Sequence, residues 1–119
     1  MRVLVTEELS EHGLDLLRAD FDVDLRPDLA TGDLAGAIGD YEALVIRSAT
    51  RVTAEVIAAA DRLKVVARAG IGLDNVDIEA ATRRGVMVAN APESNIVSAA
   101  EHTMAMLLAV ARNVPKAHA

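Results

Sequence analysis

The stretch that decides the fold is residues 43–51, which read Ala43-Leu44-Val45-Ile46-Arg47-Ser48-Ala49-Thr50-Arg51. Its first four residues are apolar without interruption, a pattern typical of a strand that is buried on both faces of a sheet. Arg47 follows at once, so a charged side chain stands where the buried strand ends. The stretch therefore predicts a central strand of a parallel sheet with an arginine at its carboxyl end.

Similar short apolar runs alternate with helical patterns along the rest of the chain. The predicted strands are Arg2–Val5, Asp22–Leu25, Ala43–Ile46, Val65–Ala67 and Val86–Val88. The predicted helices are Glu8–Ala19, Thr31–Gly39, a helix capped by Thr53, Asp77–Arg84 closed by Gly85, and Ser98–Arg112. Strands separated by helices imply right-handed crossovers and a parallel sheet. The sequence predicts an α/β fold, a flavodoxin-like doubly wound five-stranded sheet that ends in a long interdomain helix.

Composition limits the classes of function. The 119 residues suffice for one domain, and 52% are hydrophobic, so a core can form. The net charge of −6 comes without a cluster of Lys and Arg, which argues against nucleic-acid binding. No apolar run reaches about 18 residues, so we expect no membrane span. The lack of cysteine excludes disulfides and thiolate metal sites, and we expect a cytoplasmic protein without a metal site.

Two arginines and a glycine turn stand at the predicted strand ends, where doubly wound sheets bind ligands. The guanidinium groups of Arg47 and Arg68 match carboxylate or phosphate oxygens, although each arginine also suits a simple ion pair. Gly70 and Gly72 allow backbone N–H groups to approach an oxyanion, although an ordinary turn fits them as well. The turn is no dinucleotide fingerprint, because Asn75 stands where a third glycine is needed.

The predicted helix Ser98–Arg112 is apolar nearly all round, which indicates burial on several sides. We expect it to pack between domains or subunits, with a central helix of the same domain as the alternative. Asn95 lies just before it, where free N–H groups favour anions. The three histidines match no ligand set or catalytic motif.

Three stretches together resemble the D-isomer-specific 2-hydroxyacid dehydrogenases, of the D-3-phosphoglycerate dehydrogenase type. They are residues 45–53 (VIRSATRVT), 66–77 (VARAGIGLDNVD), and 90–95 (NAPESN) with 98–102 (SAAEH). They occur in the family's order and with its spacing. The resemblance implies a substrate-binding domain at residues 1–97. It also implies an interdomain helix at 98–119 that leads toward an NAD-binding domain absent from this chain.

The activity implied by the resemblance is the NAD-dependent oxidation of 3-phosphoglycerate to 3-phosphohydroxypyruvate, the entry step of serine biosynthesis. The predicted substrate-binding residues are Arg47, Ser48, Arg68, Ala69, Gly70 and Gly72. Arg47 and Arg68 would meet the phosphate end, and the backbone of 69–72 the carboxylate. Ile71 and Asn95 would lie near the nicotinamide, Ile71 through backbone or packing contacts only. The family's catalytic residues belong to the cofactor domain, so we assign none here and expect the chain alone to be inactive.

Other functions are weighed against this one. A phosphoacceptor receiver domain needs acidic residues after the first and third strands. The run Thr6-Glu7-Glu8 could mimic the first, but Arg47 stands after the third, where an aspartate is needed. A related dehydrogenase with another 2-hydroxy acid shares the fold. A non-catalytic dimerisation or regulatory module would use the apolar helix as its partner surface. In every case we expect a homodimer or larger oligomer through residues 98–112.

Overall fold

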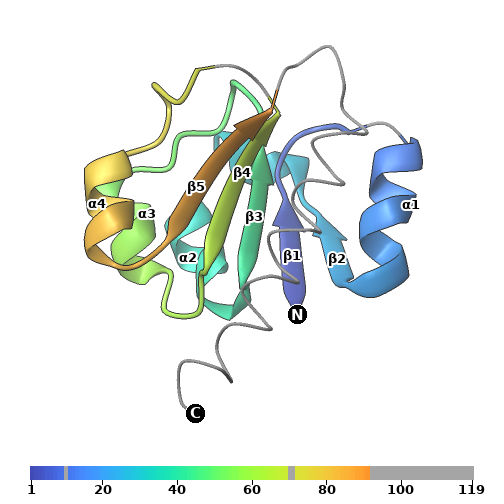
Figure 1. The fold of residues 1–119 in the computed structure, drawn as a ribbon, viewed down its shortest axis with the longest axis horizontal. Coiled ribbons are helices and arrows are strands. Elements are labelled where there is room, and N and C mark those ends of the chain that lie inside the picture. The colour runs from blue at the N-terminus through green and yellow to red at the C-terminus, as the bar shows by residue number, and fades with distance from the viewer. Residues whose placement is uncertain (10, 70–71, 92–119) are drawn as a thin grey trace.

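The computed structural model describes residues 1–9, 11–69 and 72–91 (Figure 1). The strands are β1 (Arg2–Val5), β2 (Asp22–Leu25), β3 (Ala43–Ile46), β4 (Val65–Ala69) and β5 (Met87–Ala91). The α-helices are α1 (Glu11–Asp20), α2 (Leu34–Ala37), α3 (Ala54–Ala59) and α4 (Ile78–Arg83), with short 3-10 helices η1 (Pro27–Ala30) and η2 (Ile38–Asp40). All strand pairs are parallel, in the order β2-β1-β3-β4-β5. This confirms the predicted flavodoxin-like sheet.

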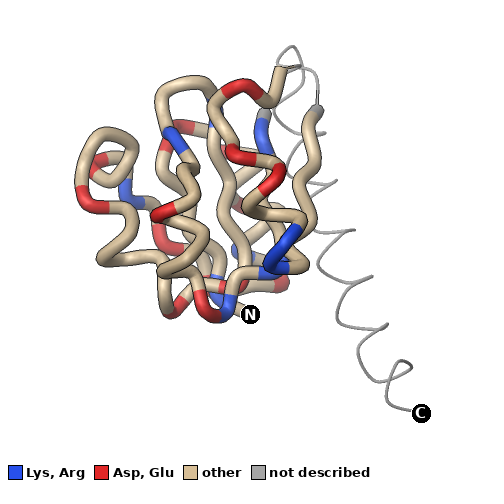
Figure 2. Tube along the Cα trace, turned by 90° about the vertical axis from the view of Figure 1, so that its left-hand side faces the viewer, with Lys and Arg blue, Asp and Glu red and all other residues tan. Residues whose placement is uncertain are grey.

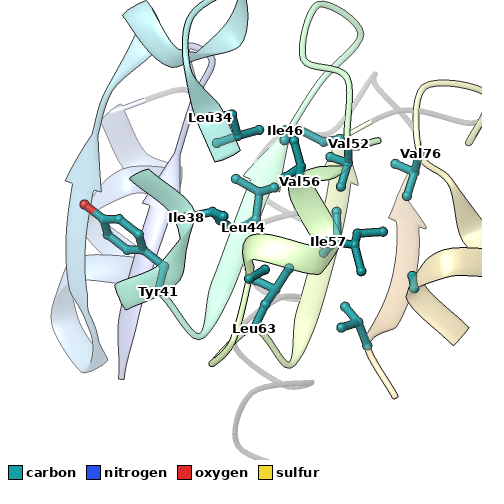
Figure 3. Packing of buried hydrophobic residues seen from close by; sticks show 14 of the residues in the cluster. Leu34, Ile38, Tyr41, Leu44, Ile46, Val52, Val56, Ile57, Leu63 and Val76 are labelled. Atoms are coloured by element: carbon teal, nitrogen blue, oxygen red, sulfur yellow. The ribbon is translucent and has the colours of Figure 1, made fainter. Parts of the chain in front are cut away.

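Helices cover both faces of the sheet. Alternate residues along each strand point to opposite faces, so Leu4 and Leu44 join one core and Val3 and Val45 the other. The first core is closed by α2, α3 and α4, whose buried side chains pack on the sheet in Figure 3. The second is closed by α1, which lies beside β2 at the opposite end of the sheet from α4 (Figure 1). Aliphatic side chains make up nearly all of both cores, as the composition predicts.

Side-chain caps set where three of the helices begin. The side chains of Asp33, Thr53 and Asp77 accept hydrogen bonds from backbone N–H groups three residues later, at 3.0, 3.3 and 3.0 Å. Thr53 is the cap that the sequence predicts. Gly85 ends α4 with φ +71°, so its predicted left-handed conformation is confirmed.

Several predicted boundaries are wrong by a few residues. The first helix begins at Glu11 and not at Glu8, and Ser10 just before it lies outside the described residues. The second helix begins only after the Asp33 cap and continues as η2. The fourth and fifth strands run two and three residues further than predicted, to Ala69 and Ala91, because their mutual ladder continues past the apolar runs.

The strand order locates the ligand-binding edge. The chain leaves β1 toward β2 on one side and reaches β3 on the other, so the direction of winding reverses between β1 and β3. Doubly wound sheets bind ligands beyond the carboxyl ends of the strands at such a point. In this chain Glu7 follows β1 and Arg47 follows β3.

Candidate functional site

Two loops meet at the carboxyl edge of the sheet, the β3 loop (residues 47–53) and the β4 loop (described from Gly72 to Asp77). An isolated parallel bridge joins Val52 to Val76. The N–H of Val52 donates to the Asn75 carbonyl at 2.9 Å, and the N–H of Asp77 donates to the Val52 carbonyl at 2.8 Å. The two loops are thus one connected surface beyond β3 and β4.

Arg68 lies inside β4, opposite Ile46 and Asn90, and not after the strand as the sequence analysis expects. Its side chain is only 10% exposed. The guanidinium Nη1 lies 2.6 Å from the Gly72 carbonyl, 2.9 Å from Asp74 Oδ1 and 2.7 Å from Asn75 Oδ1. The buried Nε has no hydrogen-bond partner among the described residues. The guanidinium is therefore held through Nη1, while its buried Nε–H has no acceptor among the described residues.

The ion pair between Arg68 and Asp74 also sets the acidity of the carboxylate. Its hydrogen bond to Arg68 holds the pKa of Asp74 below the ordinary value of 3.8, and the Arg68 charge adds to the effect. Asp74 is 91% exposed, so it balances the charge of Arg68 from the solvent side of the loop.

Asn75 ties the two loops together. Its Nδ2 donates to the carbonyls of Arg47 and Thr50, at 2.8 and 2.7 Å, while its Oδ1 accepts from Arg68. Both hydrogens of the amide and its oxygen are used in this way. From the sequence, Asn75 is recognised only as the residue that stands where a dinucleotide-binding turn needs its third glycine. The available signal was the residue type, since asparagine side chains often hydrogen-bond loop backbone.

Arg47 is fixed through its backbone, whereas Arg68 is fixed through its guanidinium. The backbone of Arg47 is fixed on both sides, whereas its guanidinium makes no hydrogen bond or ion pair within the described part of the chain. Ser48 is exposed and likewise makes none there. The structure therefore brings Arg47 next to the Ile46–Arg68 pair of the ladder and leaves its charge available to a ligand.

Glu7 fixes the β3 loop, a role that the sequence analysis missed. Its carboxylate accepts hydrogen bonds from the N–H groups of Arg47 (2.5 Å), Ala49 (3.0 Å) and Thr50 (3.2 Å), and from the Thr50 hydroxyl (2.9 Å). Partial burial alone would raise the pKa of Glu7, but these four hydrogen bonds outweigh it and lower the pKa. Behind them the buried hydroxyls of Thr6 and Thr50 lie 2.7 Å apart.

The glycine turn is described only in part, since Gly70 and Ile71 lie outside the described residues. Ala69 is the last residue of β4. A side chain at Gly72 would bring a Cβ within 3.3 Å of Asp74 Oδ1 and 3.4 Å of Arg68 Nη1, so it would crowd the ion pair between these two residues. In the described part of the turn no helix N-terminus follows Gly72 directly, because α4 begins only at Ile78, and the pyrophosphate site of a dinucleotide-binding motif needs one there.

Other predicted site residues lie in the part of the chain that the structure does not describe. Asn95 and the predicted interdomain helix of residues 98–112 belong to that part. Within the described ranges no group of His, Cys, Asp or Glu side chains is arranged to hold a metal ion. None of the helices described is long and apolar enough to cross a membrane. Basic and acidic residues are interspersed along the trace in Figure 2.

A family model for the D-isomer specific 2-hydroxyacid dehydrogenases, catalytic domain, matches residues 3–116. The chain therefore belongs to this family, as the three sequence stretches indicate. Curated relatives that it matches include D-3-phosphoglycerate dehydrogenases. The chain is 54% identical over 119 residues to D-3-phosphoglycerate dehydrogenase 2 of Arabidopsis thaliana chloroplasts. It is 42% identical over 117 residues to the Synechocystis enzyme.

These relatives are much longer than this chain. The two matches cover 99% and 98% of this chain but only 19% and 21% of the relatives. Among solved structures, the NAD+-bound 3-phosphoglycerate dehydrogenase of Entamoeba histolytica superposes with a TM-score of 0.67 and 28% identity. That match covers 77% of this chain and 33% of the other. The fold and the family are thus those of these dehydrogenases, over about a fifth of the length of the curated relatives.

Proposed function

We propose that this chain is the substrate-binding part of an NAD-dependent dehydrogenase that oxidises 3-phosphoglycerate to 3-phosphohydroxypyruvate in serine biosynthesis. Membership of the family supports the reaction class, and the names of the curated relatives support the substrate. In this reaction a hydride leaves the carbon that bears the hydroxyl group for NAD, and the hydroxyl proton is lost to a base. The proposal assigns residues 1–97 to the substrate-binding domain and 98–119 to an interdomain helix.

The observation that carries the proposal is the buried Nε–H of Arg68, which has no hydrogen-bond acceptor among the described residues. A buried donor without a partner costs free energy, about 1–3 kcal/mol by mutational series, unless a ligand or water satisfies it. Nε lies on the side of the guanidinium that can bind an oxyanion in a bidentate manner. Arg47 adds a second cation from the neighbouring strand end. A substrate with an anion beyond its carboxylate, such as a phosphorylated 2-hydroxy acid, suits two arginines.

The remaining roles follow the family resemblance. Ser48 and the backbone of Ala69, Gly70 and Gly72 would hold the substrate, and Ile71 and Asn95 would lie near the nicotinamide. Because no helix N-terminus follows Gly72 directly, the main NAD-binding residues belong to a separate domain in this proposal. We assign no catalytic residue here and expect no turnover by the chain alone. We further propose a cytoplasmic homodimer or larger oligomer through residues 98–112, for which light scattering is the test.

A ¹⁵N NMR titration of the chain with 3-phosphoglycerate tests the substrate assignment. We expect shifts confined to the amides of 47–51, 68–72 and 95, with little response to D-lactate, which has no phosphate, or to NAD. Arg47→Gln should abolish most of the response. The matched control is Arg51→Gln, which removes the same charge from the same exposed loop and should keep the response.

Two outcomes would count against the assignment. Equal shifts with D-lactate would show that the phosphate is not recognised. No shift at millimolar 3-phosphoglycerate would contradict a preformed site in this chain, and turnover by a chain extended with a cofactor domain would then test the substrate independently.

A further inference from the structure

The loop that carries Arg47 is held by a carboxylate 40 residues earlier in the sequence. Glu7 accepts three backbone N–H groups and one hydroxyl from residues 47–50, all between 2.5 and 3.2 Å. Consecutive N–H groups that converge in a loop form a concave site for an anion. In this protein the anion that fills the site is a side chain of the protein itself.

The position of this contact in the sheet gives it a functional meaning. Glu7 and the β3 loop follow β1 and β3, the two strands between which the winding reverses. This is where a doubly wound sheet normally offers its backbone N–H groups to a ligand. Because Glu7 already uses the N–H groups of Arg47, Ala49 and Thr50, a substrate anion must be bound by other groups. Arg47 is a cation of that loop whose guanidinium makes no hydrogen bond or ion pair within the described chain.

Asn75 completes the fixation from the other side. Glu7 accepts from the N–H groups of Arg47 and Thr50, while Asn75 donates to the carbonyls of the same two residues. The Cα of Arg47 is therefore fixed, although its side chain makes no hydrogen bond or ion pair to the described residues. Less conformational entropy is then lost when the guanidinium binds an anion.

We propose that Glu7 is a positioning residue, whose carboxylate holds the β3 loop so that Arg47 is presented beside Arg68 for substrate binding. The inference rests on the proposed function for the identity of the substrate, but the hold on the loop is independent of it. Arg47 is the one charged residue among those that donate to Glu7, and it does so through its backbone. The neighbouring Glu8 is exposed and serves as a matched control.

An NMR titration with acid tests the hold on the loop without any ligand. In the wild-type chain the amides of Arg47, Ala49 and Thr50 should shift in one common step, with a midpoint below the ordinary value of 4.5 for glutamate. Glu7→Gln should remove this step and speed solvent exchange of these amides about tenfold or more. Glu7→Asp keeps the carboxylate and should restore part of the step. Glu8→Gln should leave it unchanged.

A double-mutant cycle tests whether the hold matters for binding. Glu7→Gln should weaken 3-phosphoglycerate binding about tenfold, and it should add little when Arg47 is already replaced by Gln. Circular dichroism and spectral dispersion show whether the variants are folded, and Glu7→Asp serves if Glu7→Gln is not. Additive effects of the two substitutions, or wild-type amides that do not titrate together, would overturn the inference.

The outcomes separate this inference from the proposed function. A common acid step together with no binding of 3-phosphoglycerate would contradict a preformed site for this substrate in the chain and support the hold of Glu7 on the loop. Binding of 3-phosphoglycerate without a common acid step would support the substrate and overturn the role of Glu7.

Discussion

The β3 and β4 loops both carry an arginine to the same edge of the sheet, but they restrain it in opposite ways. In the β3 loop Glu7 and Asn75 fix the backbone of Arg47, and the guanidinium makes no hydrogen bond or ion pair within the described chain. In the β4 loop the guanidinium of Arg68 is itself fixed, by Gly72, Asp74 and Asn75, and its side chain is 10% exposed.

The difference shows two ways in which a cation can be accommodated at the edge of a sheet. A cation that is buried needs acceptors within the protein, because desolvation without them is costly. A cation at the surface stays solvated until a ligand arrives and needs only a fixed backbone. We therefore expect substitutions at Arg68 to change both stability and binding, and substitutions at Arg47 to change binding alone.

The largest effect is expected for Arg68→Lys. Lysine keeps the charge but loses the planar fork, so the acceptors on Asn75 and Gly72 are left poorly satisfied. The free energy of unfolding should fall by about 2–3 kcal/mol in urea denaturation. Arg47→Lys is the control and should cost less than about 0.5 kcal/mol. Equal losses of unfolding free energy in the two variants would show that the two arginines do not differ in their contribution to stability.

A smaller loss is expected for Asn75→Ala, which removes the side-chain link between the loops and leaves their backbone hydrogen bonds in place. The carbonyls of Arg47 and Thr50 lose a donor, and Arg68 loses an acceptor, so unfolding should become easier by about 1–2 kcal/mol. Hydrogen exchange should rise in both loops and not in β1 or β2. A change confined to the β4 loop would show that Asn75 does not connect the two.

Acid should weaken both loops, each through its own carboxylate. Glu7 and Asp74 have folded pKa values below their ordinary values of 4.5 and 3.8, so each binds its proton more weakly in the folded chain. Their contribution to stability is complete above those values and is lost as the pH falls through the lowered ones. Denaturation midpoints between pH 5 and pH 2 should therefore fall less steeply in Glu7→Gln and Asp74→Asn. An unchanged slope in both would refute this account.

The smallest effect is expected for Gly72→Ala. The added Cβ would crowd Asp74 Oδ1 and Arg68 Nη1 at 3.3 and 3.4 Å, but the exposed Asp74 side chain can move aside. A cost below about 1 kcal/mol is expected. Thermal denaturation at pH 7 measures it. A loss as large as that of Arg68→Lys would mean that Arg68 is more rigidly held than the contacts suggest.

The first three strands were predicted to the residue, whereas the next two were predicted too short. Arg2–Val5 and Ala43–Ile46 are apolar or nearly so, and each is followed at once by a polar residue, so their carboxyl ends are visible in the sequence. Arg68 and Asn90 interrupt the apolar pattern although they remain in the ladder, because strand pairing depends on the neighbouring backbone and not on polarity. The arginines of the candidate site were predicted; the residues that hold them were not.

The sequence by itself determined the alternation of strands and helices, the family, and the arrival of two arginines at one edge of a parallel sheet. These follow from local apolar patterns, caps and motifs, which need no knowledge of distant contacts. Only the tertiary structure decided that Glu7 meets the β3 loop and that Asn75 joins Arg47 to Arg68. Those contacts connect residues 25 to 43 positions apart and 7 positions across a turn. Spacing along the chain does not reveal them, because the strand order brings the residues together.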